Sequence, residues 1–444
     1  MSTTQEQTLE SRIEAQEFCP EIYIYPTPRM YQPLSDFSFE ELDLTEDLNV
    51  YVHVPFCKQF CSFCGYFKTI YTESLQTRFV EAVVQEIQLR RENFQAKTVK
   101  TLHFGGGTPS LLSAGELGKI VQALVEVKPD ILDTCLEVSI EATPESIDPA
   151  KFQGYREAGI NRVSMGVQSL VDSEVVLANR CVEQDRTSFQ MLTDAFQALR
   201  DIGIPDVVID LMIGIEGQTV ESFEESIKMA LTLKPETVQL YALGVMPQTA
   251  LGRRKPPRLM PGEEIYRCYD IGRRLFSEAS YKRDSHDRYT LRESSGFLQG
   301  DYNIQGMSLI GLGGGARSYS KDFHFRNTYA SLNGRKALIE YMDNVSNGRH
   351  SVESGVRLDL DEQSRQYAIG HIQALDEDLF FQRFGLRVED KFGELYTDML
   401  RLGLVQREGP VWRLTPKGLL FRDLLGRQMF SPKAKALEEA YRAL

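Results

Sequence analysis

The sequence predicts an α/β protein built around a parallel sheet, and three patterns support this fold class. From residue 48 onward, short runs rich in β-branched residues alternate with long amphipathic stretches, as expected for strands joined by helices. Glycine or polar residues follow several of these runs, and the ends of parallel strands are where such folds place their chemistry. A length of 444 residues allows a main domain and one addition.

The alternation begins with a strand over residues 50–54, a helix over residues 73–94 and a second strand over residues 99–104. Ser113 and Glu116 form a capping box that begins the helix after the second strand. Further strands are predicted over residues 136–142, 162–167, 207–213 and 237–243. About six strand–helix units imply a parallel sheet with right-handed crossovers, too few for a closed eight-stranded barrel.

The chain divides into three predicted parts. Residues 1–46 are a polar tail followed by an extended arm interrupted by prolines. Residues 47–354 hold the strand–helix units and their extension, and residues 355–444 form a C-terminal domain. The elements predicted in that domain are a helix over 389–402, a hairpin over 404–414 and a helix over 416–425. This order is typical of a mainly α, winged-helix-like module.

Composition and charge exclude several classes of function. A formal net charge of -13 argues against nucleic acid as a partner, and so against DNA binding by the C-terminal module. No apolar stretch approaches the roughly 20 residues of a membrane span, and the N-terminus lacks a basic-then-apolar signal pattern. The seven cysteines, an odd number without such a signal, are poor support for a disulfide framework. We therefore expect a cytoplasmic protein.

Three of the cysteines follow the first strand in a Cys-x3-Cys-x2-Cys run: Cys57, Cys61 and Cys64. This spacing allows three thiolates to converge on one metal centre within a single loop. Three thiolates hold three irons of a 4Fe-4S cube and leave the fourth iron open to a cofactor or substrate. A structural zinc site is the alternative, but zinc normally takes a fourth protein ligand, which this run does not offer nearby.

The cysteine spacing resembles the radical S-adenosylmethionine (SAM) superfamily, in which the open iron binds SAM. The Tyr-x-His-x-Pro run of Tyr51, His53 and Pro55 further resembles the family of oxygen-independent coproporphyrinogen III oxidase and its relatives. The resemblance implies a partial (β/α)6 radical SAM barrel with the chemistry at the C-terminal ends of the strands. It also implies a C-terminal cap over the substrate site, a 4Fe-4S cluster, SAM, and an electron donor such as flavodoxin or ferredoxin.

Further segments match that family in order and neighbourhood. They are residues 105–109, 139–144 and 162–169, together with Arg180 and Asp210. A phosphate-binding loop is the alternative for the glycine run of residues 105–107, but the Gly-Lys-Ser/Thr ending is missing.

The family can hold two SAM molecules, and the residue-by-residue match implies two sets of contacts. The SAM on the cluster would contact Tyr51, Gly106 and Glu141. The second position would be lined by Phe63, Gly107, Thr108, Gln168, Arg180, Asp210 and Ala242.

Three departures from the oxidase pattern bear on the reaction. Tyr66 stands where the oxidase has a further cysteine, and residues 214–216 read Gly-Ile-Glu in place of Gly-Leu-Pro. Arg317, in a late glycine segment, replaces an apolar residue of the oxidase. The first and third weaken any transfer of the oxidase's own reaction.

We therefore expect a radical SAM enzyme resembling the family's class C methyltransferases, which use two SAM molecules to alkylate an unsaturated carbon of a small molecule. In the implied mechanism, a 5'-deoxyadenosyl radical from the first SAM takes hydrogen from the methyl group of the second. Two alternatives remain open: oxidative decarboxylation of coproporphyrinogen III, and haem binding as in the family's chaperone branch. The implied substrate is a small molecule such as an aromatic compound or a tetrapyrrole.

Overall fold

The computed structural model describes residues 8–20, 24–34, 37–180, 185–254, 259–292, 296–330 and 333–442. Within these ranges the largest sheet has 13 strands. Its centre is a run of parallel neighbours in the order β12 (Ser308–Leu312), β2 (Asp47–Val54), β5 (Thr98–Gly106), β6 (Glu137–Ala142), β7 (Arg162–Gln168), β8 (Asp206–Ile213) and β9 (Thr237–Ala242). The parallel sheet predicted from the sequence is therefore confirmed.

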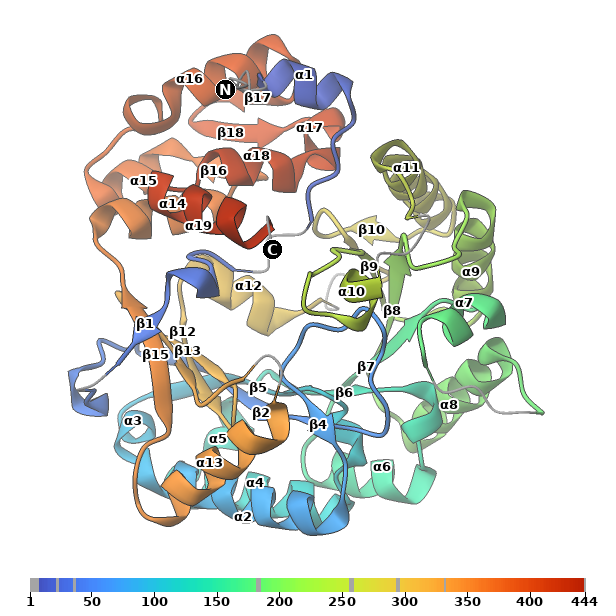
Figure 1. Ribbon diagram of the computed structural model, residues 1–444, viewed down its shortest axis with the longest axis vertical. Helices are drawn as coiled ribbons and strands as arrows, with labels where there is room; N and C mark the ends of the chain where they lie inside the picture. Colours follow the sequence, from blue (N-terminus) through green and yellow to red (C-terminus); the bar gives the residue numbers. More distant parts are fainter. Residues whose placement is uncertain are drawn as a thin grey trace.

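Figure 1 shows that these strands curve round in an arc with the connecting helices on the outside. The outer helices are α2 (Glu73–Leu89), α4 (Ala114–Val127), α6 (Pro149–Glu157), α8 (Ser188–Ile202) and α9 (Val220–Thr232). Their apolar faces and the sheet form one large core in which Phe79, Phe104 and Phe223 are fully buried. The capping box of Ser113 and Glu116 begins α4 as predicted. This arrangement confirms the α/β class and the partial barrel.

The predicted helix over residues 73–94 is in fact two helices. α2 ends at Leu89, and a short helix α3 (Glu92–Gln95) follows. Arg90 leaves helical geometry with φ -103° and ψ 11°, and its guanidinium turns inward, where Nη1 donates to the carbonyl oxygen of Gly311 at 2.6 Å. A continuous apolar pattern across the break hid this inward turn.

The sheet continues on both sides of the arc through short strands that the sequence did not predict. Next to β12 the sheet continues, in order, with β13 (Arg317–Tyr319), β14 (Phe323–Asn327), β15 (Val352–Arg357) and β1 (Gln32–Pro33). Each of these strands is antiparallel to the one before it. Beyond β9 lie β11 (Arg288–Thr290) and β10 (Lys282–Arg283). Because β1 pairs with β15, the N-terminal arm becomes the last strand of the sheet.

Helix α12 (Leu298–Gln305) closes the barrel interior at the N-terminal ends of the strands. The Gln299 amide donates to the carbonyl oxygen of Val50 at 2.9 Å, and the Leu298 backbone amide donates to Glu137 at 3.1 Å. Helix α12 therefore covers the interior, as its floor, at the N-terminal ends of the strands, which leaves their C-terminal ends as the side where ligands can bind.

The C-terminal part has a second hydrophobic core of its own. Its elements are α14 (Leu360–Gly370), β16 (Ala374–Asp376), α15 (Glu377–Phe384), α16 (Val388–Arg401), β17 (Val405–Glu408), β18 (Val411–Leu414), α17 (Pro416–Leu420), α18 (Arg422–Gln428) and α19 (Pro432–Arg442). The hairpin turns at Gly409, where φ is +63°, as the sequence predicts. The predicted helix over 416–425 is instead divided at Phe421.

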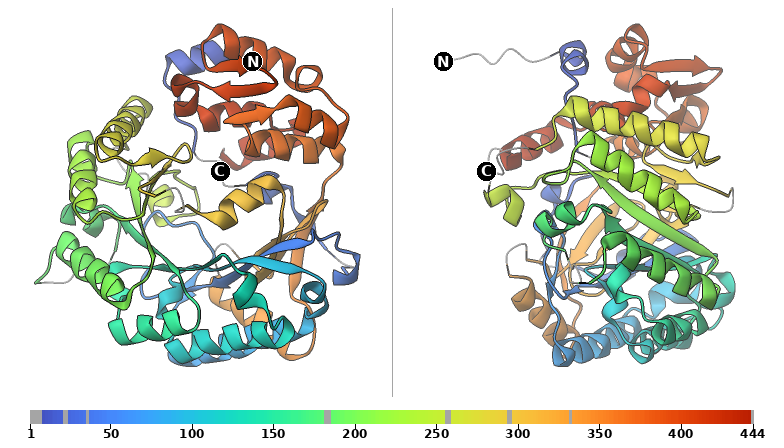
Figure 2. Two further views of the ribbon diagram at one scale, coloured as in Figure 1. Left: turned by 180° about the vertical axis from the view of Figure 1, so that it is seen from behind. Right: turned by 90° about the vertical axis from the view of Figure 1, so that its right-hand side faces the viewer.

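The N-terminal arm packs against this second core. Ile13 of α1 (Leu9–Glu14), Cys19, Tyr25 and Met30 are all buried in it. Both views in Figure 2 show α1 beside the C-terminal helices. The arm thus joins the C-terminal part to the edge of the sheet, while the exact division into three domains stays a prediction. Among the described helices, none is long and apolar enough to cross a membrane.

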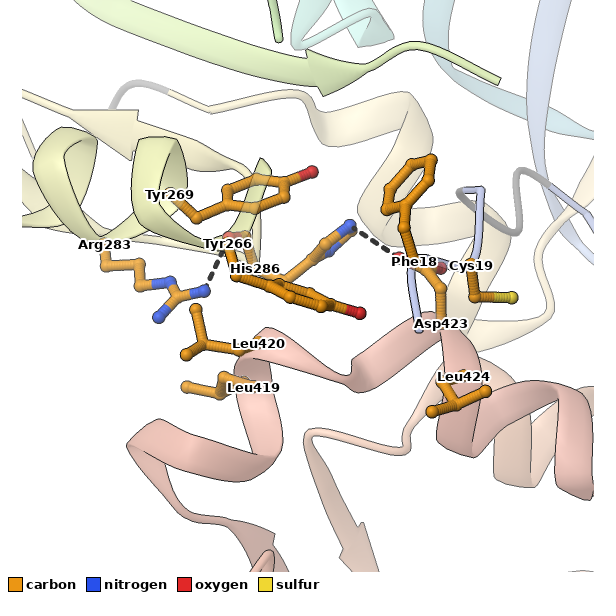
Figure 3. A pocket seen from close by; sticks show the side chains of 10 residues that line it. All are labelled: Phe18, Cys19, Tyr266, Tyr269, Arg283, His286, Leu419, Leu420, Asp423 and Leu424. Carbon is orange, nitrogen blue, oxygen red and sulfur yellow. Dashed lines mark hydrogen bonds and ion pairs between the residues drawn. The ribbon is translucent and has the colours of Figure 1, made fainter. Parts of the chain in front are cut away.

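A small cavity lies where the arm, the barrel and the C-terminal part meet (Figure 3). His286 faces Asp423 of α18 across it at 3.7 Å, and Arg283 donates to the carbonyl oxygen of His286 at 2.6 Å. Its free volume of about 10 Å³ is room for no more than one water molecule. This seam therefore holds the parts together and is not a ligand site.

A buried carboxylate in α2 fastens the added strands to the barrel. Glu86 accepts hydrogen bonds from the backbone amide of Gly313 at 2.7 Å, the Tyr341 hydroxyl at 2.7 Å and the Asn327 amide at 2.8 Å. Arg90, fully buried, lies 3.8 Å away. One side chain thus connects α2, the end of β12, β14 and α13 (Gly334–Ser346).

We expect Glu86→Ala to lower the free energy of unfolding by about 3 to 5 kcal/mol, because it leaves buried donors and the Arg90 charge without their partner. Urea denaturation of the purified protein measures this loss. Glu81→Ala, exposed on the same helix, is the matched control and should change stability by less than about 0.5 kcal/mol. Equal losses in the two variants would contradict the role assigned to Glu86.

Candidate active site at the carboxyl ends of the parallel strands

The cysteine loop leaves the sheet directly after β2. Cys57 lies in the short strand β3 (Phe56–Cys57), which pairs with β4 (Thr69–Ile70) and so fixes both ends of the loop. The Ser62 backbone amide donates to the carbonyl oxygen of Ala178 at 2.9 Å, and the Leu251 amide donates to that of Ser62 at 2.7 Å. The loop is therefore held from the segments that follow β7 and β9.

The three thiols lie close enough to interact electrostatically with one another. Burial raises the pKa of Cys57 to about 12, and the Thr108 hydroxyl donates to its sulfur at 3.8 Å. Burial also raises the pKa of Cys61, although Arg180 Nη1, 3.6 Å from that sulfur, opposes the shift. Thiolates at this loop thus require a positive centre to stabilise them, which an iron-sulfur cluster provides.

The number of ligands that the loop offers distinguishes a cube from a single ion. Among the described residues, no group of three or more His, Cys, Asp or Glu side chains is arranged to hold a metal ion, and a structural zinc site normally takes four protein ligands. Cys57, Cys61 and Cys64 supply three thiols from one loop, the number that a 4Fe-4S cube with one open iron uses.

The glycine run at the end of β5 lies directly beneath this loop. A Cβ on Gly107 would lie 2.7 Å from the Phe56 carbonyl oxygen and 3.0 Å from Cys57 Sγ. Gly106 has φ +122°, and a Cβ there would lie 2.7 Å from the His53 ring. Both positions therefore need glycine, for space and, at Gly106, also for its backbone conformation.

Glu141 in β6 faces the barrel interior beside these glycines. Its carboxylate accepts a hydrogen bond from the Gly106 amide at 2.9 Å and lies 3.3 Å from His103 Nε2. Burial acts to raise the pKa of Glu141, but the contacts with His103 and Gly106 outweigh it, and the pKa lies below its usual value. The side chain is nevertheless 41% exposed. Glu141 is thus an accessible anion, suited to the cationic amino group of SAM.

Tyr51 of β2 completes this side of the site. Its hydroxyl lies 2.9 Å from His53 Nδ1, and His53 Nε2 lies 3.0 Å from the carbonyl oxygen of Phe67. Because a carbonyl only accepts, Nε2 carries the proton and Nδ1 accepts from Tyr51. The Tyr51 ring stacks near His103 at 5.7 Å. The ring is therefore fixed from two sides, while its face remains available to a ligand.

Three polar residues of the predicted second SAM position lie on β7, on β8 and in the segment between them. Gln168, the last residue of β7, has φ +71°, and its Oε1 is buried without a hydrogen-bond partner among the described residues. Asp210 in β8 accepts from the Ser164 hydroxyl at 2.9 Å, and burial raises its pKa to about 7. Arg180 donates to the carbonyl oxygen of Gly166 as well as to Cys61. An unpartnered buried acceptor beside these groups fits a ligand with hydroxyl or amino donors.

The remaining residues predicted for the second position occupy the rim. Phe63 packs from the cysteine loop against Met212, Leu243 and Leu251, and Ala242 is the buried last residue of β9. Thr108 and Gly107 touch the loop at Cys57. All ten predicted SAM residues thus lie on parallel strands, just beyond their carboxyl ends, in the cysteine loop or in segments that contact it, and their contacts with SAM stay predictions.

Comparisons with known proteins agree with this geometry. Residues 51–230 match the family model of the Radical SAM superfamily. The chain is 29% identical over 400 residues to the oxygen-independent coproporphyrinogen III oxidase of Salmonella typhimurium, covering 85% of this chain and 84% of the relative. A solved structure of coproporphyrinogen III oxidase from Escherichia coli, described as a radical SAM enzyme, aligns with a TM-score of 0.78 at 25% identity, covering 92% and 96% of the two chains.

This chain is a radical SAM enzyme, similar along most of its length to oxygen-independent coproporphyrinogen III oxidases. The heme chaperone HemW of Bacillus subtilis is a similar relative, 27% identical over 401 residues that cover 86% of this chain and 98% of the chaperone. Membership of the superfamily implies a 4Fe-4S cluster and SAM, as the cysteine spacing predicts.

Sequence reasoning missed the residues that hold the radical SAM site in place. His103 lies within hydrogen-bond distance of both Glu141 and Ser139 Oγ, the latter at 2.8 Å, and the Ser164 hydroxyl donates to Asp210. His103 is paired with Tyr51 on the neighbouring strand, and Ser164 is paired with Glu141, so each shares a face of the sheet with a predicted site residue. Finding them from the sequence would have required the register between the parallel strands, which the sequence does not give.

We expect Gly107→Ala to lower the iron and sulfide content of the reconstituted enzyme several-fold while the fold remains intact. The added methyl group would meet the Phe56 carbonyl and Cys57 Sγ and push the cluster loop outward. Iron analysis and visible absorption after anaerobic reconstitution measure the effect. Gly115→Ala is the control, since nothing lies within 4 Å of its Cβ position. Full cluster loading of Gly107→Ala would show that the close approach is not required.

Proposed function

We propose that this radical SAM enzyme acts on a tetrapyrrole that bears carboxylates, in the manner of oxygen-independent coproporphyrinogen III oxidase. The observation that carries the proposal is the alignment with the Escherichia coli oxidase over 92% of the chain with a TM-score of 0.78. This coverage exceeds the share of the chain in residues 47–354, so the likeness extends beyond the barrel and its extension.

Cys57, Cys61 and Cys64 would hold the cluster, and Glu141 with Gly106 would hold SAM against it. When bound, the cluster supplies one electron that cleaves SAM into methionine and a 5'-deoxyadenosyl radical. Glu141, kept ionised by His103 and the Gly106 amide, attracts the amino group of SAM. Helix α12 closes the interior from below, so water is excluded from that side of the reacting groups.

A second SAM molecule is part of the proposal. Gln168, with its unpartnered Oε1, and Asp210 offer acceptors beside the cluster loop, and Thr108 and Phe63 complete the opening. These groups lie on β7, β8 and the segments beside the cysteine loop, next to Glu141 on the neighbouring strand β6. Two positions at one opening would bring two cofactor molecules together with the substrate.

Methyl transfer of the class C type is the second candidate, and one observation favours it. Tyr66, which stands where the oxidase has a further cysteine, is 56% exposed and so is open to a substrate beside the cluster loop. Haem binding, as in the chaperone relative, is the third outcome to be tested. The unpartnered Oε1 of Gln168, beside the residues predicted to hold SAM, supports turnover over passive haem binding.

We expect the reconstituted enzyme, given SAM, dithionite and coproporphyrinogen III, to release carbon dioxide together with 5'-deoxyadenosine. Hydrogen abstraction from the carbon β to a substrate carboxylate would leave a radical that forms a vinyl group by losing carbon dioxide and one electron, which a one-electron acceptor added to the assay takes up. Product release is followed by carbon-14 trapping and liquid chromatography. Stoichiometric S-adenosylhomocysteine without carbon dioxide would establish methyl transfer instead. Haem uptake with neither product would establish the chaperone activity.

We expect Glu141→Ala to lose SAM cleavage and Asp210→Ala to keep slow production of 5'-deoxyadenosine without turnover of substrate. Losing a charge-assisted bond typically weakens binding about ten- to a hundredfold. Equilibrium dialysis with labelled SAM should give two equivalents for the parent and one for Asp210→Ala. Asp210 is a sharper probe than Arg180, which also touches Cys61. A parent that binds only one equivalent at saturation would exclude the second position.

A further inference from the structure

Two arginines lie on the same face of the sheet as the SAM site. Arg317 in β13 and Arg326 in β14 are directly opposite one another in the antiparallel register. Tyr319, two residues from Arg317, lies opposite Leu309 of β12, and β12 runs beside β2 in a register that continues this face to Tyr51. Both guanidinium groups therefore belong to the interior face that also carries the predicted SAM contacts.

This pair is short of negative partners. Arg317 forms no ion pair with a carboxylate of the described residues, and the groups that act on its charge are Tyr319, Tyr31 and Tyr66. Arg326 has Glu353 at 3.7 Å, but that carboxylate is itself 40% exposed. Like charges directly opposite in a sheet destabilise it. A fold that retains such a pair in a partly buried place has a use for the positive charge.

Three buried polar atoms around the arginines lack hydrogen-bond partners among the described residues: the Tyr31 hydroxyl, His324 Nδ1 and Arg326 Nε. Tyr31 is 7% exposed and His324 is 1% exposed. Tyr31 lies within electrostatic range of both Arg317 and Arg326, and His324 is opposite Tyr319 in the register. Since buried polar groups in folded proteins nearly always have partners, these atoms mark a place where a polar ligand group belongs.

We propose that Arg317, Arg326 and the Tyr31 hydroxyl bind a carboxylate group of the substrate. A planar guanidinium suits a carboxylate, which can accept two parallel hydrogen bonds from it. The inference rests on the proposed function and names the residues that face an acid side chain of the substrate. With its acid side chain held here, a substrate reaches toward Tyr66, next to the cysteine loop, and toward Tyr51, both of which interact with the Arg317 charge.

The N-terminal arm has a direct part in this site. Tyr31 precedes β1, which pairs with β15 at the edge of the sheet, and β15 neighbours β14 with Arg326. Arg326 Nη2 donates to the Ser354 hydroxyl of β15 at 3.3 Å, and Arg326 Cζ lies 3.9 Å from the centre of the Tyr329 ring. The guanidinium is thus positioned by its neighbours while Nε stays available.

The test compares coproporphyrin III with its tetramethyl ester, which has the same ring without free carboxylates. Binding to the reconstituted, SAM-loaded enzyme is measured by porphyrin fluorescence. We expect Arg317→Gln to weaken binding of the acid about ten- to a hundredfold and to leave binding of the ester unchanged. Arg317→Lys should recover part of the loss. Arg357→Gln, on β15 with a side chain 61% exposed, should bind both ligands like the parent.

Two results would overturn the inference while the proposed function stands. One is parent-like binding of the acid by Arg317→Gln. The other is equal weakening for the acid and the ester, which would indicate a general change of shape. The melting temperature tests for such a change: because Arg317→Gln removes a like-charge repulsion, the variant should melt no lower than the parent.

The carboxylate of SAM is the other source of this ligand chemistry. SAM binding by Arg317→Gln should equal that of the parent; weakened SAM binding with parent-like porphyrin binding would assign the site to SAM and overturn the substrate assignment. If the parent enzyme binds no porphyrin, the proposed function is wrong, and the carboxylate site is tested separately. In that test, phenylglyoxal modifies Arg317, and peptide mass spectrometry measures the rate with and without citrate. Citrate should slow the modification, and an unchanged rate would overturn the inference as well.

Discussion

The close approach of the cysteine loop to the end of β5 depends on the absence of side chains at Gly105, Gly106 and Gly107. Each glycine leaves room for a different functional group: Gly105 for Tyr51, His103 and Glu141, Gly106 for His53, and Gly107 for Cys57. The Gly106 amide then reaches the Glu141 carboxylate. Loop, carboxylate and aromatic ring are therefore set by one backbone segment, and a side chain at any of the three would displace a group of the site.

The interior of the barrel shows where the site begins. At the level of the floor, charges are paired: Arg162 lies 3.3 Å from Asp206 and 3.7 Å from Glu137. Toward the carboxyl ends of the strands Glu141 and Asp210 also have partners, but the Glu141 side chain is accessible and Gln168 keeps a buried oxygen without one. An accessible carboxylate beside an unpartnered acceptor is what distinguishes the binding site from the ion pairs of the floor.

The parallel strands were predictable because each is a β-branched run bounded by a polar or glycine segment, as residues 99–107 show. The cysteine loop was predictable from spacing alone. The short strands β13, β14, β15 and β1 were not, because two to six residues carry no period, and their pairing partners lie far away in the sequence. Arg317 stood out only as a departure from a pattern; its neighbour Arg326 and the arm residue Tyr31 come beside it only through tertiary pairing.

Acidic and basic side chains lie on different strands of the interior face, and this separation matches the charges of the proposed ligands. Glu141 and Asp210 lie on β6 and β8, where the cationic SAM is expected, whereas Arg317 and Arg326 lie on β13 and β14, beyond β2 on the other side of the cysteine loop. A dianionic or more acidic substrate would be repelled from the first side and attracted to the second. Cofactor and substrate would then approach the loop from opposite ends of one sheet, each excluded from the other's place by charge. Arg317 and Arg326 lie on the antiparallel strands added to the parallel barrel, which Glu86 connects to α2 and the N-terminal arm extends. Under the proposed function, these additions would help to select the substrate as well as complete the sheet.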